Sequence, residues 1–377
     1  MIHSIILKDF KCFSDYRLPL GCLTVLTGTN GSGKSTVMQA LLALRQSQEQ
    51  GALARGQLAL NGSWVHLGTG QDVLRESAEG IEVGIGLQVE RDYLWHFAYS
   101  ANAEELAATS VPPTIPELAL FREPTSGDGA TFQYLCAERI GPRTSFSLAD
   151  HAVRHRRLLG AAGEYTAQYL AEFGRDVVRQ ELRHADAAAS DLRSQTEAWL
   201  SHIVGEGSTG DLRIHVQTHR AMDVAQLQFA FSSPRIGESN RYRPTNVGFG
   251  LTYSLPVIVA VLSAGPGALL LIENPEAHLH PRGQAEIGIL LARSAASGVQ
   301  ILVETHSDHV LNGIRRAVRS KILEAGLTSI HFFRRTVEAQ EQVVSPVLDP
   351  TGNIDHWPEG FFDQFEKDMN HFAGWGD

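Results

Sequence analysis

The spacing of apolar side chains divides the chain into buried strands and helices. Residues 23–27 form a short β-prone run, and after a glycine-rich segment apolar residues recur at helical spacing over residues 37–44. Two later runs, residues 268–272 and 299–303, are almost continuously apolar, as is typical of strands buried on both faces of a parallel sheet. This pattern predicts an α/β fold with a mixed β-sheet at its centre.

The first half of the chain adds a second β-layer and an insertion. Residues 1–27 contain two predicted strands, and residues 81–89 alternate apolar with polar or small residues, which predicts a half-buried strand that pairs with residues 93–99. Residues 103–129 are rich in Pro, Ser, Thr and Gly and are interpreted as a loop or subdomain junction. Residues 147–204 have few helix breakers and predict helices without the sustained heptads of a coiled-coil arm.

The second half returns to the central sheet. Residues 214–231 predict strands, and residues 245–250 form a turn that opens an apolar helix through residue 262. Residues 330–333 and 342–347 are expected to close the sheet. We expect one domain over residues 1–377, made of three parts: an N-terminal lobe (1–100), an inserted helical and β lobe (101–245) and a C-terminal lobe (246–377).

Composition narrows the class of protein without naming a function. The chain has 377 residues, 43% of them hydrophobic and 20% charged, which is ordinary for a globular protein with a core. The formal net charge of −10 excludes a nucleic-acid binder that is basic over its whole surface, so DNA or RNA would need a local basic patch. No apolar run reaches membrane-spanning length. Three scattered cysteines, Cys12, Cys22 and Cys136, favour a cytoplasmic location and no metal knuckle.

The glycine-rich segment carries the clearest chemical signal. Residues 28–35 match the pattern Gly-x-x-x-x-Gly-Lys-Ser at every fixed position, between a predicted strand and a predicted helix. Backbone N–H groups of such a loop turn inward around phosphate, at the positive end of the new helix. Lys34 would reach the β- and γ-phosphates of ATP, and the Ser35 hydroxyl would bind Mg²⁺. The alternative is a chance glycine-rich turn. The predicted nucleotide-binding residues are Asn30, Gly31, Ser32, Gly33, Lys34, Ser35 and Thr36.

A second signal follows the apolar run at 268–272. That strand ends in Glu273, a Walker B arrangement in which the carboxylate would hold Mg²⁺ opposite Ser35. The alternative is a buried strand that ends in a surface glutamate. The chain continues as Asn-Pro-Glu-Ala-His-Leu-His-Pro through residue 281, and the next buried strand ends in Glu-Thr-His-Ser over residues 304–307.

Together these motifs resemble ATP-binding-cassette ATPases of the RecF, SMC and OLD (overcoming lysogenisation defect) type. More narrowly, the chain is similar to bacterial "AAA family ATPase" proteins with a Glu-Asn-Pro-Glu Walker B. The resemblance spans both ends of the chain and includes residues 8–13, the phosphate loop, residues 134–143, the turn at 246–250, Walker B, the Thr-His-Ser segment and residues 357–363. Residues 150–240 match only in being helical and then β.

The resemblance implies that two heads close around two ATP molecules. Each phosphate loop would meet the signature turn of the partner, for which Asn246, Gly248 and Gly250 are the matching residues. An ordinary helix N-cap at Asn246 is the alternative. His306 matches the switch histidine that senses the γ-phosphate, although a structural role is the commoner one for a histidine after a strand. Gln71 is the candidate for the glutamine loop that contacts Mg²⁺, with a surface turn as the equal alternative.

One departure from the family affects the expected chemistry. The usual catalytic glutamate follows the Walker B acid directly, and that position here is Asn274. An amide can orient a water molecule and cannot take its proton. We predict that Glu276 takes over as base and that hydrolysis is slow. A long-lived ATP clamp is the alternative. A zinc site at His278, His280 and His309 is a minor alternative to a loop that contacts the partner head.

The expected function is an ATP-dependent switch in DNA transactions or anti-phage defence, with a separate effector such as a nuclease or toxin. This expectation comes from the resemblance alone. OLD-type proteins append a nuclease domain after the head, and the chain is expected to be too short to contain one. An ATP-bound scaffold that sequesters a protein partner is the alternative, and a transporter ATPase is a weaker third. Basic clusters at residues 154–157 and 315–319 are more often solvated helix faces, and DNA or RNA patches are the alternative.

Overall fold

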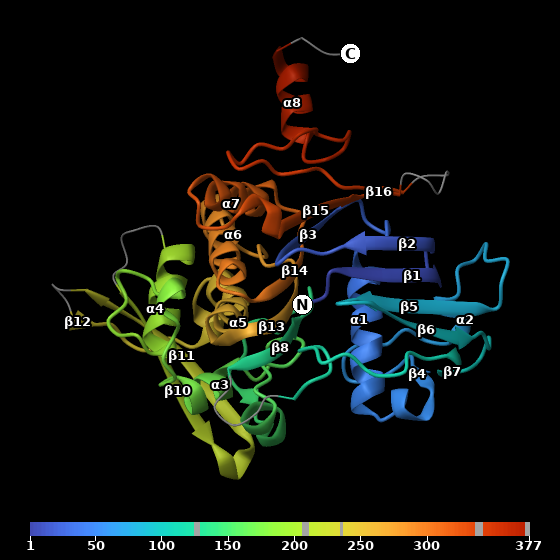
Figure 1. Ribbon diagram of the computed structural model, residues 1–377. Coiled ribbons are helices and arrows are strands. Elements are labelled where there is room, and N and C mark those ends of the chain that lie inside the picture. Colours follow the sequence, from blue (N-terminus) through green and yellow to red (C-terminus); the bar gives the residue numbers. More distant parts are fainter. Residues whose placement is uncertain (124–128, 206–210, 234–236, 336–341, 374–377) are drawn as a thin grey trace.

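A computed structural model describes residues 1–123, 129–205, 211–233, 237–335 and 342–373. At its centre lies a six-stranded sheet in the order β16-β15-β3-β14-β13-β8 (Figure 1). All neighbours in this sheet are parallel except β16 and β15. The strands are β3 (Leu23–Gly28), β8 (Ala130–Leu135), β13 (Ala264–Glu273), β14 (Gln300–Glu304), β15 (Thr328–Phe333) and β16 (Val343–Val344).

Both faces of this sheet are buried, which explains the continuous apolar runs. Leu270 and Ile272 of β13 belong to one core cluster, which they share with helices α5 (Phe249–Ser263), α6 (Pro281–Ala296) and α7 (Asp308–Arg319). The alternate residues Leu269 and Leu271 belong to a second cluster with α1 (Lys34–Glu49). Successive side chains of a strand point to opposite faces, so a strand between two helical layers must be apolar at nearly every position. The prediction that residues 268–272 and 299–303 are parallel strands of the central sheet is confirmed by β13 and β14, which pair with each other.

The N-terminal half forms an antiparallel sheet that covers α1 from the other side. Its order is β2-β1-β5-β6-β7-β4, and the predicted pairing of residues 81–89 with 93–99 is confirmed by β5 and β6. Val83, Ile85 and Leu87 alternate inward into the α1 cluster. The strands are β1 (Ser4–Phe10), β2 (Phe13–Pro19), β4 (Gln57–Ala59), β5 (Glu82–Gln88), β6 (Asp92–Ala98) and β7 (Glu105–Ser110).

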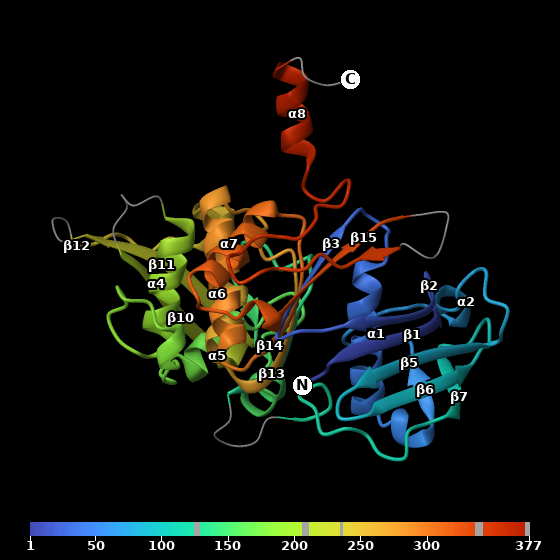
Figure 2. The same cartoon turned by 45° about the horizontal axis from the view of Figure 1, so that its top comes forward.

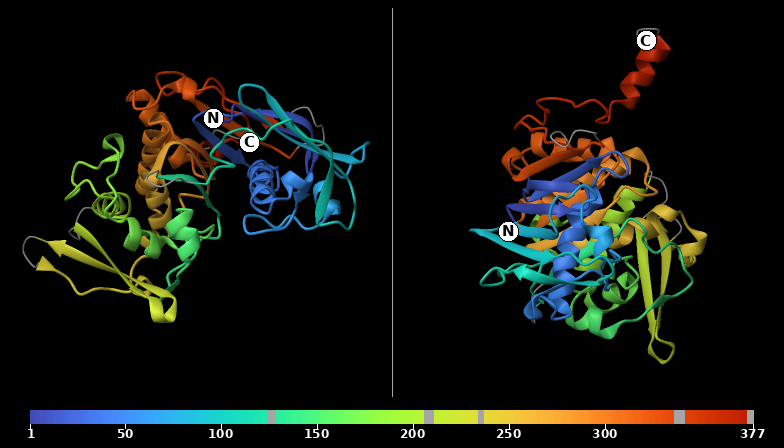
Figure 3. Two further views of the ribbon diagram at one scale, coloured as in Figure 1. Left: turned by 60° about the horizontal axis from the view of Figure 1, so that its bottom comes forward. Right: turned by 90° about the vertical axis from the view of Figure 1, so that its right-hand side faces the viewer.

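A third sheet lies on the opposite side of the molecule, beyond α5 and α6 (Figure 3). It pairs β10 (Asp211–His219) with β11 (Val224–Ser233), which also pairs with β9 (Phe146–Ser147) and β12 (Gly237–Glu238). The prediction of helices throughout 147–204 is wrong in part, because only α3 (Thr166–Phe173) and α4 (Leu192–Val204) form regular helices longer than five residues. Asp191 caps α4 by accepting a hydrogen bond from the Ser194 N–H at 3.1 Å.

Two further details differ from the sequence-based expectation. The segment 103–129 contains β7, which extends the antiparallel sheet, and the next strand, β8, joins the central sheet beside β13. The expected boundary near residue 100 therefore falls inside the antiparallel sheet. Shorter helical segments are η1 (Leu53–Arg55), α2 (Gly70–Val73), η2 (His151–His155), η3 (Gln180–Leu182), η4 (Arg220–Met222), η5 (Pro244–Asn246) and η6 (Ala325–Leu327).

The C-terminal segment returns along α7 before it leaves the body of the molecule. Arg315 of α7 donates to the backbone carbonyl of Gly352 at 2.8 Å, and Phe361 packs edge-on against Phe332 of β15. The last helix, α8 (Gln364–Ala373), then points away from the three sheets (Figure 2).

Candidate nucleotide site

The glycine-rich loop lies at the carboxyl end of β3, the edge of a parallel sheet at which ligands bind. Gly28 has a φ of 134°, and a Cβ there would stand 2.1 Å from the backbone oxygen of Phe333. Gly33 has a φ of 105°, and a Cβ there would stand 2.6 Å from the Cys12 sulfur. Both positions therefore need glycine to let the backbone turn between β15 and the β1–β2 hairpin.

The loop delivers its N–H groups to the start of α1. Gly33 is the residue before α1, and no side chain caps that helix end. The first N–H groups of a helix have no partner within the helix, and they carry the positive end of its dipole. This arrangement matches an anion site for the phosphates of a nucleotide. Asn30 and Gly31 lie exposed at the loop tip, whereas Ser32 and Thr36 are buried.

Lys34 is folded back over its own loop. Its ammonium donates to the backbone carbonyls of Gly28 at 3.1 Å and Thr29 at 2.8 Å, and it lies 3.9 Å from the Glu304 carboxylate. The side chain is only 4% exposed. Burial lowers its pKa, and the charge of Glu304 opposes that effect.

Ser35 contacts a carboxylate that sequence reasoning missed. Its hydroxyl donates to Glu304 at 2.9 Å, whereas the predicted partner, Glu273, lies one strand further away, paired with Glu304 in the strand register. The difference arises because β14 is inserted between β3 and β13, so the acid at the end of β14 is the one beside the loop. Burial and the charge of Glu273 raise the pKa of Glu304, and the Ser35 and Lys34 contacts lower it.

The Glu273 carboxylate is held from the far side of the sheet. It accepts hydrogen bonds of 3.0 Å from the Tyr134 hydroxyl and 3.0 Å from the Ala137 N–H. Burial raises the pKa of Tyr134, with the charge of Glu273 adding to the effect, so this phenol stays a donor at any ordinary pH.

The turn after β13 brings the remaining predicted polar residues together. Asn274 has a φ of 45°, and its N–H donates to the Glu304 carbonyl at 2.8 Å. One carboxylate oxygen of Glu276 accepts a hydrogen bond of 2.9 Å from the backbone N–H of His306. The other oxygen is buried and has no partner among the described residues. Burial and the nearby charge of Lys34 lower the pKa of His306 below its ordinary value. A buried carboxylate oxygen without a donor is suited to accept a hydrogen bond from a water molecule.

Arg139 fixes this turn from behind, and it was recognised in the sequence only as part of a resembling segment. Its side chain is buried and donates to the backbone carbonyls of Glu273 and Asn274. It also reaches the carbonyls of Cys136 at 3.3 Å and Tyr253 at 3.2 Å. One guanidinium thereby joins the turn after β13 to helix α5.

The predicted signature residues lie at the start of α5, away from the loop of their own chain. Asn246 and Gly248 are exposed, and a Cβ on Gly248 would meet no atom within 4 Å. Gly250 is buried, and a Cβ there would lie 3.0 Å from the backbone oxygen of His278. In the described residues no hydrogen bond links these three residues to residues 28–36. The Asn246 N–H donates to the Arg243 carbonyl at 2.9 Å, so the exposed Asn246 side chain and Gly248 are the parts of this turn that are open to a second molecule.

Gln71 lies outside the immediate site. It is exposed on α2, and its N–H donates to the Ala101 carbonyl at 3.0 Å. Helix α2 adjoins the β1–β2 turn, where the Lys11 N–H donates to the Val73 carbonyl at 2.7 Å. Within the described ranges the structure gives Gln71 no side-chain contact with Ser35 or Glu304.

The oxygen donors at the loop fit Mg²⁺ bound together with a nucleotide. Mg²⁺ keeps several waters and takes one or two carboxylates plus phosphate oxygens. Ser35 and Glu304 supply a hydroxyl and a carboxylate next to the phosphate cradle. No group of three or more His, Cys, Asp or Glu side chains in the described part of the chain could hold a metal by itself, which gives the zinc alternative no support.

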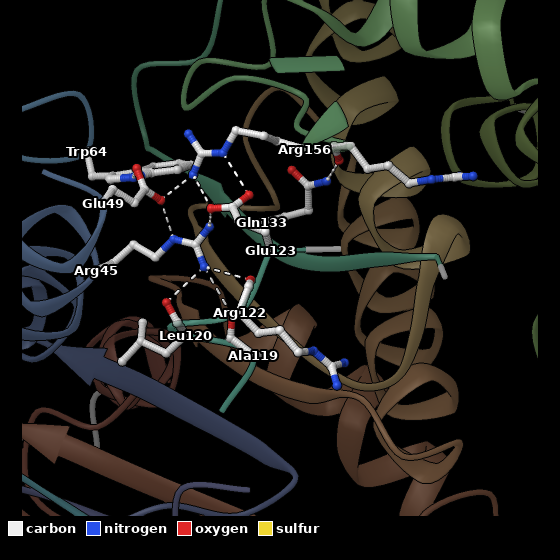
Figure 4. Close-up of polar contacts among 10 residues, drawn as sticks. Arg45, Glu49, Trp64, Ala119, Leu120, Arg122, Glu123, Gln133 and Arg156 are labelled. Carbon is white, nitrogen blue, oxygen red and sulfur yellow. Dashed lines mark hydrogen bonds and ion pairs between the residues drawn. The ribbon is translucent and has the colours of Figure 1, made fainter. Parts of the chain in front are cut away.

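The basic cluster at residues 154–157 is neutralised within the molecule. Arg154 pairs with Glu172 at 2.8 Å and Arg157 with Asp176 at 2.7 Å. Arg156 pairs with Glu49 and Glu123 (Figure 4). These pairs favour a structural role over a nucleic-acid patch. In the second cluster, Arg315 is used internally, whereas Arg316 and Arg319 are exposed on α7.

Comparisons with known proteins place this geometry in a class. Residues 1–104 match a family described as "AAA ATPase domain", and residues 236–312 match "AAA domain, putative AbiEii toxin, Type IV TA system". Residues 323–371 match a protein of unknown function, DUF3696. The OLD nuclease of Thermus scotoductus is 23% identical over 340 residues, and the match covers 81% of this chain. It covers 59% of that relative, so the chain spans about three fifths of its length.

A solved structure supports the fold. The Smc head bound to the C-winged helix domain of ScpA superposes with a TM-score of 0.52 at 14% identity, over 92% of this chain and 98% of that one. The fold and the phosphate-loop site together define an ATPase head of the ATP-binding-cassette type. Within that class, the matches to an OLD nuclease and to the putative AbiEii toxin family support an ATPase of the RecF/SMC/OLD-like type.

A membrane span needs a helix of sufficient length and hydropathy. Across the described segments, no helix is both long enough and apolar enough to cross a bilayer.

Proposed function

We propose that this head binds ATP with Mg²⁺, pairs with a second copy around the nucleotide and hydrolyses it slowly. The observation that carries the proposal is the loop between β3 and α1, which combines glycines at positive φ, an uncapped helix start and the buried ammonium of Lys34. Together these features form a binding site for the phosphates of a nucleoside triphosphate.

The arrangement of the signature turn supports pairing. Asn246 and Gly248 at the start of α5 are exposed, and among the described residues no hydrogen bond joins them to the phosphate loop of the same chain. A γ-phosphate bound at residues 28–36 of one copy would therefore reach such a turn only on another copy. Each nucleotide would then join two molecules, and its hydrolysis would release them.

Slow hydrolysis follows from the residues after β13. Asn274 cannot accept a proton from water, so a base must come from another position. The unpartnered oxygen of Glu276 is the best placed described carboxylate, because the other oxygen is fixed by the His306 N–H. His306 would then report on the γ-phosphate through the same turn.

The biological role we propose is a switch in DNA transactions or anti-phage defence that controls a separate effector protein, a nuclease or a toxin. The similarity to an OLD nuclease and to a toxin–antitoxin family supports this role. The alternative is a scaffold that holds a protein partner while ATP stays bound. Asn274 at the usual position of the catalytic base favours this scaffold alternative, because an amide cannot take a proton from water and ATP turnover is then weak.

A complementation experiment tests the proposal. Molar mass in solution is measured for the full chain without nucleotide, with ADP and with ATP and Mg²⁺. We expect a doubling only with ATP, and no doubling for Lys34→Ala. Gly248→Asp should also block pairing, because it adds a negative charge where phosphate would arrive, and the open space at Gly248 lets the side chain fit.

The mixture of the two variants gives the sharper result. If each site uses the loop of one copy and the turn of the other, Lys34→Ala and Gly248→Asp together form a dimer with one intact site. Partial recovery of ATPase turnover and of the doubled mass is expected. Nucleotide binding with a constant monomer mass would contradict the proposal of pairing.

A further inference from the structure

One carboxylate binds both functional groups of the phosphate loop. Glu304 accepts the Ser35 hydroxyl at 2.9 Å and faces the Lys34 ammonium at 3.9 Å. Among the described residues, these are the partners of its side chain. Glu304 is only 7% exposed, so its charge is compensated mainly by this lysine and this hydroxyl.

The backbone leaves Glu304 little freedom to move away. It ends β14, whose neighbours are β3 on one side and β13 on the other. Its carbonyl accepts the Asn274 N–H at 2.8 Å, and the Thr305 N–H beyond it donates to the Leu26 carbonyl at 3.0 Å. The carboxylate must therefore stay beside the loop when a nucleotide arrives.

A nucleotide without metal would disturb this arrangement. Triphosphate oxygens would draw Lys34 away from the carbonyls of Gly28 and Thr29 and from Glu304. Glu304 would then be a buried anion without its cation, next to the negative phosphates. Leaving one member of a buried pair uncompensated is strongly unfavourable. A divalent cation removes the conflict, because it binds the carboxylate, the Ser35 hydroxyl and phosphate oxygens together.

We infer that Glu304 makes nucleotide binding by this head conditional on a divalent cation. The inference rests on the proposed function, and it assigns to the acid after β14 the role that the sequence pattern assigned to Glu273. In the structure Glu273 is already bound by Tyr134 and Ala137, so its charge is compensated without the loop.

The test compares two glutamates at the same register position of neighbouring strands. Affinity for an ATP analogue with a methylanthraniloyl fluorophore is measured with Mg²⁺ and with EDTA, for wild type, Glu304→Gln and Glu273→Gln. Glutamine keeps the shape and an oxygen for Ser35, and removes the charge. Glu304→Ala, with thermal melting of every variant, covers the case in which the amide disturbs folding.

For wild type we expect Mg²⁺ to tighten binding about 5- to 150-fold, the usual range for coupling between two ligands. In Glu304→Gln the ratio should fall to within about threefold of one, mainly because binding in EDTA improves. Glu273→Gln should keep most of the wild-type ratio. A ratio that survives in both Glu304 variants, or that Glu273→Gln abolishes instead, overturns the inference.

Failure of the proposed function gives a different result. If wild type does not bind the analogue even with Mg²⁺, or if Lys34→Ala binds it equally well, the loop is not a nucleotide site. Electron paramagnetic resonance with Mn²⁺ in place of Mg²⁺ adds a readout independent of affinity. The Mn²⁺ signal of the nucleotide complex should change in Glu304→Gln and stay unchanged in Glu273→Gln.

Discussion

The Tyr134 hydroxyl donates a hydrogen bond of 3.0 Å to the Glu273 carboxylate, across the boundary between β8 and β13. The two strands come from distant parts of the sequence and run parallel at the edge of the central sheet. This contact holds the acid after β13 on the side away from the phosphate loop. The site therefore lies at the ends of three neighbouring strands: the phosphate loop follows β3, Glu304 ends β14 and Glu273 ends β13.

Tyr134→Phe should lower the free energy of unfolding, because it leaves one oxygen of Glu273 without its donor. Loss of a hydrogen bond to a charged group costs about 1.5–3 kcal/mol. Urea unfolding followed by circular dichroism measures the change. Tyr242→Phe is the control, since Tyr242 is 38% exposed and should cost nearly nothing. Equal midpoints for the two variants would show that Tyr134 does not hold Glu273.

The local sequence predicted the strand, glycine-rich loop and helix at residues 23–44, because the signals for all three are contiguous in the chain. The role of Glu273 could not be predicted, since it depends on strand order. Only the insertion of β14 between β3 and β13 shows that Glu304 is the acid beside Ser35. Nothing in the residues around 304 indicates which strand will be its neighbour.

Long-range pairing also decides between the two interpretations of the basic cluster at residues 154–157. The arginines at 154–157 read as a basic patch when their sequence neighbours alone are considered. Their acidic partners lie far away in the sequence, at Glu49 in α1, Glu123 in a connecting segment, and Glu172 and Asp176 around the end of α3. Charge patterning along a chain does not reveal which charges the fold will neutralise.

Arg139→Lys should destabilise the protein by about 2–4 kcal/mol, because lysine cannot reproduce the forked donor geometry and leaves buried carbonyls unpaired. The side chain is 3% exposed and binds carbonyls from three separate segments. Chemical denaturation measures the loss. Arg143→Lys is the matched control, because Arg143 is exposed in the same sequence motif. A loss of similar size in both variants would contradict the role given to Arg139.

Glu49→Gln tests the network that ties α1 to the inserted region (Figure 4). Glu49 accepts from Trp64 at 2.8 Å and pairs with both Arg45 and Arg156. Arg45 is 1% exposed and also donates to the carbonyls of Ala119 and Leu120. We therefore expect a loss of about 1.5–3 kcal/mol in unfolding free energy, as for a lost hydrogen bond to a charged group, because both arginines keep Glu123 as an acidic partner. Glu79→Gln, at an exposed glutamate, should be nearly neutral.

His331 gives the protein a predictable sensitivity to acid. The ring is 1% exposed, and its nitrogens lie 2.7 Å from the Pro19 carbonyl and 2.8 Å from the Ser345 hydroxyl. The carbonyl only accepts, so Nε2 carries the proton and Nδ1 accepts from the hydroxyl. Burial lowers the pKa of His331 from 6.5 to about 4. The folded protein therefore resists a proton that the unfolded chain takes up readily.

Because the unfolded state binds more protons between pH 6.5 and pH 4, the stability present above pH 6.5 falls as pH decreases through this window. At 1.36 kcal/mol per unit, the loss from this histidine approaches about 3 kcal/mol near pH 4. Unfolding free energy is measured by urea at several pH values for wild type and His331→Gln. The variant should start less stable at pH 7.5 and lose less on acidification, because it has no imidazole to protonate. His3→Gln serves as the exposed control. Parallel pH profiles for wild type and His331→Gln would show that the acid sensitivity arises elsewhere.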